Sequence, residues 1–393
     1  MFKKLDVNFK TIAANSFAIF FGFTVWRVLF NNYGKEVFDI SAYQIGIIQS
    51  VREIPGLLGF GSGMLALVLA ESKIAALNII ILGGGLLMVG WAENLWMMGV
   101  GTFISSVGFH YFLSSNKSQL LNLIKRRNSG REQGKLMSIE SISAVAATLA
   151  VLGLTLFLSY RVTFTIIGSA VTLFGIYFVF AIKSNRVEGE RRRAIVKKKY
   201  WLYYTLAFLR GSRRHIFTTF AIFLLVANHG LSITAISTLL LINSILIIFT
   251  SRLIGNLTDS MGERFILVGT SFILFFIFLG YTYVTYLPVL IGCFILDHIL
   301  FGSSIALNSY LRKISDREDL TGNLSFGLTA NHISAVFIPI IGGAMWELFG
   351  YETTFLFGTV IVFLDMLFAM RINPDKFDDA QKKVSDKEII AKT

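Results

Sequence analysis

Long apolar segments alternate with short polar loops along the whole chain, and the loops hold most of the lysines and arginines. A helix needs about 20 consecutive, mostly apolar residues to cross the hydrocarbon core of a bilayer. The chain has twelve such segments, so we predict an all-α integral membrane protein with twelve transmembrane helices. The predicted spans are 9–31, 42–69, 74–93, 96–120, 137–160, 162–182, 200–227, 231–254, 265–285, 288–310, 322–346 and 351–371.

The loops on one side of the predicted membrane are strongly basic. Cationic residues are retained on the cytoplasmic side during insertion. With the amino terminus inside, only Lys35 and Arg161 of the 36 lysines and arginines fall in loops on the outer side. We therefore expect a multi-pass protein of the cell (cytoplasmic or inner) membrane with both termini in the cytoplasm.

The second half of the sequence repeats features of the first at an offset of 188 residues, which pairs His110 with His298 and Ser115 with Ser303. A shared offset across several helices implies two pseudo-symmetric six-helix bundles related by an axis along the membrane normal. The predicted organisation is a first bundle at 1–182, a basic cytoplasmic connector at 183–199, a second bundle at 200–371 and a cytoplasmic tail at 372–393.

The loop between the predicted eighth and ninth helices reads Gly255-Asn-Leu-Thr-Asp259-Ser-Met-Gly262-Glu-Arg264. Gly262 permits a sharp turn, and Asp259 can pair with Arg264 or with a helix end. This G-x-L-x-D-x-x-G-x-R pattern resembles a cytoplasmic loop of the major facilitator superfamily, and the resemblance extends over essentially the whole chain. In the equivalent first-half loop only the acid Glu71 persists. The resemblance implies the superfamily fold, secondary transport, and a conformational switch at these two loops.

The predicted seventh helix carries Arg210, Arg213 and Arg214, beginning about ten residues into the span. At a rise of 1.5 Å per residue this is roughly 15 Å from the membrane surface, near the midplane. Arg210 and Arg214 lie one turn apart with Arg213 adjoining, so their guanidinium groups can converge on one ligand. The alternative is that these side chains extend to the cytoplasmic interface.

Polar residues in two further helices are candidates for a polar seam. Gln49, Arg52 and Glu53 form a polar face of helix two, which is either a structural ion pair or a site of proton coupling. Asn331 and His332 in helix eleven are placed to join such a seam.

Histidines occupy equivalent places in helices four and ten, where His298 follows Asp297 and His110 is its counterpart. Histidine exchanges protons near neutral pH, and an adjacent carboxylate favours its protonated form. The alternative is a neutral histidine that hydrogen-bonds between helices. The resemblance implies that helices one, four, seven and ten line a central cavity, which adds Arg27 to the candidates. Arg27 and Trp26 can instead anchor the helix at the lipid headgroups.

Composition excludes several classes of protein. Charged residues make up 15% of the chain, against about 25% in soluble proteins. The net charge of +12 lies in short loops, so we expect no nucleic-acid partner. Cys293 is the only cysteine, which leaves no cysteine-based metal site, and we expect neither a metal nor a cofactor. The sequence has no H-E-x-x-H or G-x-S-x-G motif, and we predict that the protein is not an enzyme.

The ionisable residues near the midplane of the predicted spans are mainly cationic, because the acids there are Glu53, Asp297 and Asp365. The resemblance places helix twelve at the periphery, so Asp365 is expected to support packing. Our hypothesis is secondary transport of a small organic or phosphorylated anion, since guanidinium groups bind carboxylates and phosphates. The expected substrate-binding residues are Arg27, His110, Arg210, Arg213, Arg214 and His298. Protonation of Glu53, Asp297 or His298 would couple transport to the proton gradient.

Two alternatives remain at this point. The protein can be an exporter of amphipathic drugs or lipids with the same fold, or a receptor or scaffold that does not transport. The expected partners are a small-molecule substrate, protons and the lipid bilayer, and we expect a monomer.

Overall fold

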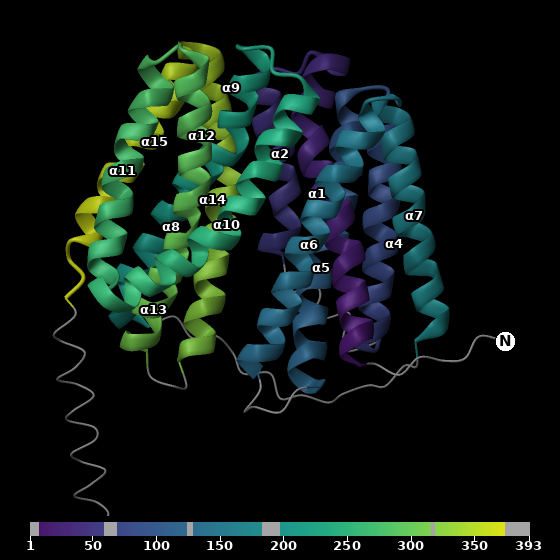
Figure 1. Cartoon of the computed structure of the whole chain (residues 1–393), viewed down its shortest axis with the longest axis horizontal. Helices are drawn as coiled ribbons and strands as arrows, with labels where there is room; N and C mark the ends of the chain where they lie inside the picture. The colour runs from purple at the N-terminus through teal and green to yellow at the C-terminus, as the bar shows by residue number, and fades with distance from the viewer. Residues whose placement is uncertain (1–7, 59–68, 124–128, 183–196, 316–318, 374–393) are drawn as a thin grey trace, which may run out of the picture. The chain divides into compact units, whose positions relative to one another are not determined.

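The computed structural model describes residues 8–58, 69–123, 129–182, 197–315 and 319–373, and the regular elements in these ranges are helices (Figure 1). Eight helical segments among them are long and apolar enough to cross a membrane. The predicted fold class, an all-α integral membrane protein, is confirmed. The end of the second predicted span, most of the predicted connector and most of the tail lie outside the described residues.

The chain divides into two compact units. The first consists of Met1–Arg191 and Ile222–Ser244, and the second of Arg192–Ala221 and Ile245–Thr393. The predicted boundaries of the bundles, connector and tail stay a prediction.

The helices of the first unit follow the predicted spans closely. They are α1 (Phe9–Phe38), α2 (Ala42–Leu57), α4 (Glu71–Gly90), α5 (Leu95–Leu123), α6 (Ser129–Thr155), α7 (Tyr160–Ala181), α9 (Ile222–Ala227) and the start of α10 (Ile233–Met261).

The second unit contains two predicted spans that are interrupted. Its helices are α8 (Trp201–Ile216), the end of α10, α11 (Glu263–Tyr283), α12 (Leu287–Leu300), α13 (Ser304–Ile314), α14 (Leu320–Phe349) and α15 (Tyr351–Ala369). A π-helix at Phe217–Ala221 follows α8, and a 3₁₀ turn at Phe301–Ser303 joins α12 to α13. A further 3₁₀ turn, Lys198–Tyr200, precedes α8.

Glycines allow three helices of the first unit to approach closely. A Cβ atom at Gly85 of α4 would lie 2.3 Å from the backbone nitrogen of Ser105 in α5. A Cβ atom at Gly83 would lie 2.3 Å from the Thr172 hydroxyl oxygen in α7. Helices in a membrane associate through such small residues because lipid provides little hydrophobic force between them. The glycines of α4 therefore set its spacing from α5 and α7.

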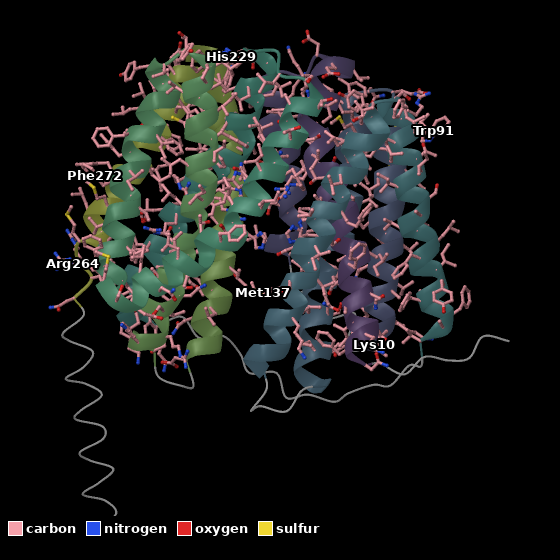
Figure 2. The ribbon with its side chains drawn as sticks, viewed as in Figure 1. Lys10, Trp91, Met137, His229, Arg264 and Phe272 are labelled. Atoms are coloured by element: carbon pink, nitrogen blue, oxygen red, sulfur yellow. The ribbon has the colours of Figure 1, made fainter. Side chains whose placement is uncertain are left out.

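Large apolar side chains remain exposed on the outer surfaces of the helices. Phe272 of α11 is 54% exposed and projects outward, as Figure 2 shows, and Arg264 lies nearer the start of the same helix. Extensive exposed apolar surface is unusual for a soluble protein. A lipid environment accounts for it.

The turn of the sequence motif forms as predicted. Gly262 has φ +83°, a conformation that favours glycine, and separates the end of α10 from the start of α11. This turn lets two long helices meet without an intervening loop.

The start of α8 is pinned to the start of α14 by a charged contact. Asp319 accepts hydrogen bonds from the Lys197 ammonium and the Tyr200 hydroxyl, both at 2.8 Å, and Lys199 lies 3.4 Å away. The hydrogen bond from Lys197 holds the pKa of Asp319 below its ordinary value, and the same bond raises the pKa of Lys197. The contact joins the residues that precede α8 to the helix that packs beside it.

We expect Asp319→Asn to lower the melting temperature of the purified protein slightly at neutral pH. Because the pKa of Asp319 is lowered by folding, its stabilising contribution is present above its ordinary pKa of 3.8 and is lost as the pH falls through the lowered value. Melting temperatures of both proteins, measured from neutral pH to below 3.8, should therefore converge. Asp259→Asn, at an exposed acid, is the control; an equal effect there would contradict the assignment.

Candidate functional site

The three arginines of α8 reach different surroundings. Arg210 and Arg213 turn into the second unit, where each meets a carboxylate, whereas Arg214 is exposed. In the structure Arg210 therefore lies apart from the other two guanidinium groups, and its predicted contact with a substrate stays a prediction. Helical spacing places the Cβ atoms, but a long guanidinium side chain turns to the partner that neutralises it.

Arg210 is held by a network of three other helical elements. Its Nη2 atom lies 3.1 Å from the Asp365 carboxylate of α15, and it also donates to the Leu267 carbonyl at 3.0 Å. Its Nη1 atom donates to the Ser303 hydroxyl at 2.9 Å. Ser271 donates to Asp365 at 2.6 Å and completes the network. Asp365 was expected to support packing, and its pairing with Arg210 shows how it does so.

Arg213 and Asp297 form a buried ion pair between α8 and α12. The Asp297 side chain is 0% exposed and that of Arg213 is 6% exposed. One carboxylate oxygen, Oδ2, has no hydrogen-bond partner among the described residues. The Arg213 guanidinium also lies over the Phe301 ring, with its Cζ atom 5.0 Å from the centroid. The pair therefore neutralises one cation of α8 and leaves one acceptor atom unused.

Arg214 shares the Phe301 ring with Arg213. Its Cζ atom lies 5.3 Å from the same centroid, and Arg214 is exposed while Phe301 is partly buried. The His298 ring lies 5.1 Å from the Phe301 ring and 5.3 Å from the Phe217 ring, between centroids. The predicted residues Arg213, Arg214 and His298 are thus brought together around one aromatic ring.

Both helices of this cluster leave regular α geometry immediately beyond it. The π-helix at Phe217–Ala221 starts two residues after His215, and the 3₁₀ turn at Phe301–Ser303 starts three residues after His298. Irregular helical segments often occur at functional sites, and in transporters they lie at substrate sites. Neither interruption was predicted from the sequence. Gly302 and the serines after it are the signal for the second, because Gly/Ser pairs mark helix kinks, but no comparable signal marks the first.

The first unit contains a related but separate cluster. Arg52 and Glu53 form an ion pair, and the His110 Nε2 atom lies 3.9 Å from a Glu53 oxygen. The Arg52 guanidinium lies over the Trp26 ring, at 5.1 Å, and over the Phe23 ring, at 5.5 Å. The predicted polar face of helix two thus meets helices one and four, and Gln49 is buried one turn before it.

Trp26 and Arg27 point to different environments. Trp26 is 2% exposed and its indole nitrogen donates to the Thr102 hydroxyl in α5 at 3.1 Å, whereas Arg27 is exposed. Headgroup anchoring by Trp26 is therefore ruled out, because a side chain enclosed by α5 does not reach the lipid surface.

The ion pair at the motif turn is formed by a residue that the sequence analysis did not select. Glu263, directly after the turn, pairs with Lys313 at 2.8 Å and accepts from Ser309 at 2.7 Å. Asp259 and Arg264 are exposed and form no ion pair with each other among the described residues. The switch role of the loop, including Gly255 and Glu71, stays a prediction.

The predicted seam at helix eleven lies against α8. A Cβ atom at Gly211 would be 3.0 Å from the Asn331 amide oxygen, so the two helices are close at this level. Ser212 donates to Ser334 at 3.2 Å one turn further along α14, and His332 is partly buried. These polar contacts fix α8 beside α14.

Comparisons with known proteins show which proteins share this fold. Residues 201–391 match the sequence model of the Major Facilitator Superfamily. A bacterial homologue of the human lysosomal transporter Spinster, in an inward-facing and unoccupied conformation, has a TM-score of 0.77 at 14% identity, covering 92% of this chain and 95% of that chain. The nucleoside transporter NupG has a TM-score of 0.74 at 16% identity, covering 93% of this chain and 100% of that chain. No curated protein sequence matches.

The predicted resemblance is therefore confirmed. The chain has the fold of major facilitator superfamily transporters, and its second half matches the sequence model of that superfamily.

We expect Asp365→Ala to lower the free energy of unfolding by about 3 to 5 kcal/mol, because it leaves Arg210 buried without its ionic partner. The double variant Arg210→Leu with Asp365→Leu should recover most of this loss, since neither position then holds a buried charge. Denaturant titration of the purified protein measures both. Lys35→Gln, which breaks an exposed pair with Asp39, should change stability by less than about 1 kcal/mol. If the double variant is as unstable as Asp365→Ala, the pairing does not explain the role of Arg210.

Proposed function

We propose that this protein is a secondary transporter that moves a small organic or phosphorylated anion by alternating access, coupled to protons. The superfamily fold supports transport as the general activity. The cluster around Phe301 supports an anion as the substrate, because two guanidinium groups and a histidine surround one ring next to two helix interruptions.

Arg214 is the residue that carries the substrate assignment. It is exposed at the edge of the cluster, and a guanidinium group offers two parallel hydrogen bonds to a carboxylate or phosphate. Arg213 and His298 lie on the same ring and would complete the anion contact. Arg210 is assigned a supporting role instead, since its network occupies both terminal nitrogens.

The first unit contributes Arg27 and His110 to the proposal. Arg27 is exposed on α1, and His110 adjoins the Arg52–Glu53 pair. The first unit thus has its own arginine and histidine as candidates for contact with an anion.

Proton coupling is proposed at two of the buried carboxylates, Asp297 and Glu53. Asp297 and Glu53 are each paired with an arginine and lie beside a histidine in sequence or in space. Protonating either acid would release its arginine, which changes the charge available to an anion. This coupling links proton uptake to substrate binding without a further cofactor.

We expect Arg214→Gln to weaken the apparent affinity for the transported anion by about 10- to 100-fold, the cost of one charged hydrogen-bond partner. A thermal-stability screen of purified protein against anionic, neutral and cationic metabolites identifies the ligand, and uptake into proteoliposomes then measures the variant. Arg161→Gln is a matched control, because Arg161 is also exposed over an aromatic ring, that of Trp91, at 4.9 Å.

Three results of this experiment would contradict the proposal in different ways. Unchanged anion uptake in Arg213→Gln and Arg214→Gln would reject the arginine role. Transport of neutral or cationic amphipathic compounds without competition by anions would favour the exporter. Binding without any substrate-dependent flux would favour a receptor or scaffold.

We expect Asp297→Asn to abolish substrate-driven proton movement while substrate exchange across the membrane continues, because exchange needs no net proton transfer. A pH-sensitive dye inside proteoliposomes reports the protons, and radiolabelled counterflow reports the exchange. Glu53→Gln tests the acid that is paired with an arginine in the first unit. Wild-type proton movement in both variants would exclude coupling at these carboxylates.

A further inference from the structure

A row of contacting aromatic and cationic side chains lies where α8 begins and α15 ends. The Arg371 Cζ atom is 5.3 Å from the centroid of the Phe368 ring, and the Phe368 and Trp201 rings meet edge to face with centroids 6.1 Å apart. Trp201 is 45% exposed and Arg371 is also exposed. The contact therefore links two helices of the second unit at their surface. We call this place, formed by Trp201, Phe368 and Arg371, the corner.

Among the described residues, the charges next to these side chains are mainly positive. Lys198 is exposed and its carbonyl accepts from the backbone nitrogen of Trp201. Its neighbours Lys197 and Lys199 both contact Asp319. With two lysines sharing this acid, and with Lys198 and Arg371 exposed, cations outnumber acids among the residues that the structure describes at this corner.

An apolar surface continues from the corner along both helices. Phe208, seven residues after Trp201 and so on the same side of α8, is 39% exposed. Leu364 and Leu367 are exposed near the end of α15. Beneath them, Leu202 and Ala369 belong to one buried cluster, so the surface rests on packed helices.

We propose that this corner binds the headgroup of an anionic phospholipid. Arg371 and Lys198 contact the headgroup phosphate, Trp201 lies at the boundary between headgroups and acyl chains, and the acyl chains follow the surface of Phe208 and Leu364. Tryptophan prefers that boundary, and basic residues at the inner membrane surface attract anionic lipids. The adjoining apolar surface favours a lipid over free phosphate, because free phosphate has no apolar part to contact that surface.

The test is native mass spectrometry of the purified full-length chain titrated with phosphatidylglycerol or with phosphatidylcholine of the same acyl chains. We expect tighter binding of phosphatidylglycerol to the wild type, and a loss of about fivefold for Arg371→Gln or Lys198→Gln. Phosphatidylcholine has the same phosphate beside a choline cation, so its binding should fall less than that of phosphatidylglycerol, and the binding that remains shows that the variants are folded. Trp201→Leu should weaken binding of both lipids.

Arg312→Gln is the matched control, since Arg312 is an exposed arginine of the same unit on α13. An equal loss in this control would show a diffuse charge effect and overturn the site. Wild-type phosphatidylglycerol binding in the double variant Lys198→Gln with Arg371→Gln would also overturn it. Complete displacement of the lipid by excess inorganic phosphate would point to a site for free phosphate instead.

Discussion

Neutralising buried arginines is the constraint on which the arrangement of the second unit depends. A guanidinium group removed from water needs a partner, because the free energy of leaving it uncompensated is several kcal/mol. Arg210 takes Asp365 from α15, and Arg213 takes Asp297 from α12. Two neighbouring cations of one helix thus hold two other helices in place, and Arg214 is presented at the surface beside them.

The two units neutralise their buried arginines differently. In the first, Arg52 pairs with Glu53, its neighbour in sequence, and the aromatic rings come from α1. In the second, the pair of Arg213 and Asp297 spans two helices. Protonation in the first unit would therefore change a local contact. Protonation of Asp297 would release a link between helices, so under the proposed mechanism the conformational response is expected in the second unit.

Helix irregularity and lipid contact lie at opposite parts of α8. Its end passes into the π-helix beside the arginine cluster, and its start carries Trp201 at the exposed corner with Arg371. Between them, α8 is fixed along α14 by Ser212 and by the close approach at Gly211. A lipid bound at the corner would contact the helix that presents the proposed substrate residues.

The sequence by itself determined the membrane class, most of the helical segments and the resemblance to the superfamily, because apolar runs and the Gly262 turn are local properties of the chain. It also predicted that Asp297 and His298 belong to one site, which stays a prediction. It did not predict that Arg210 would be occupied by Asp365, which lies 155 residues later in the chain (365 minus 210). Helical periodicity states which side a residue lies on, but only the tertiary packing decides which carboxylate a long side chain meets, and so which arginine remains exposed.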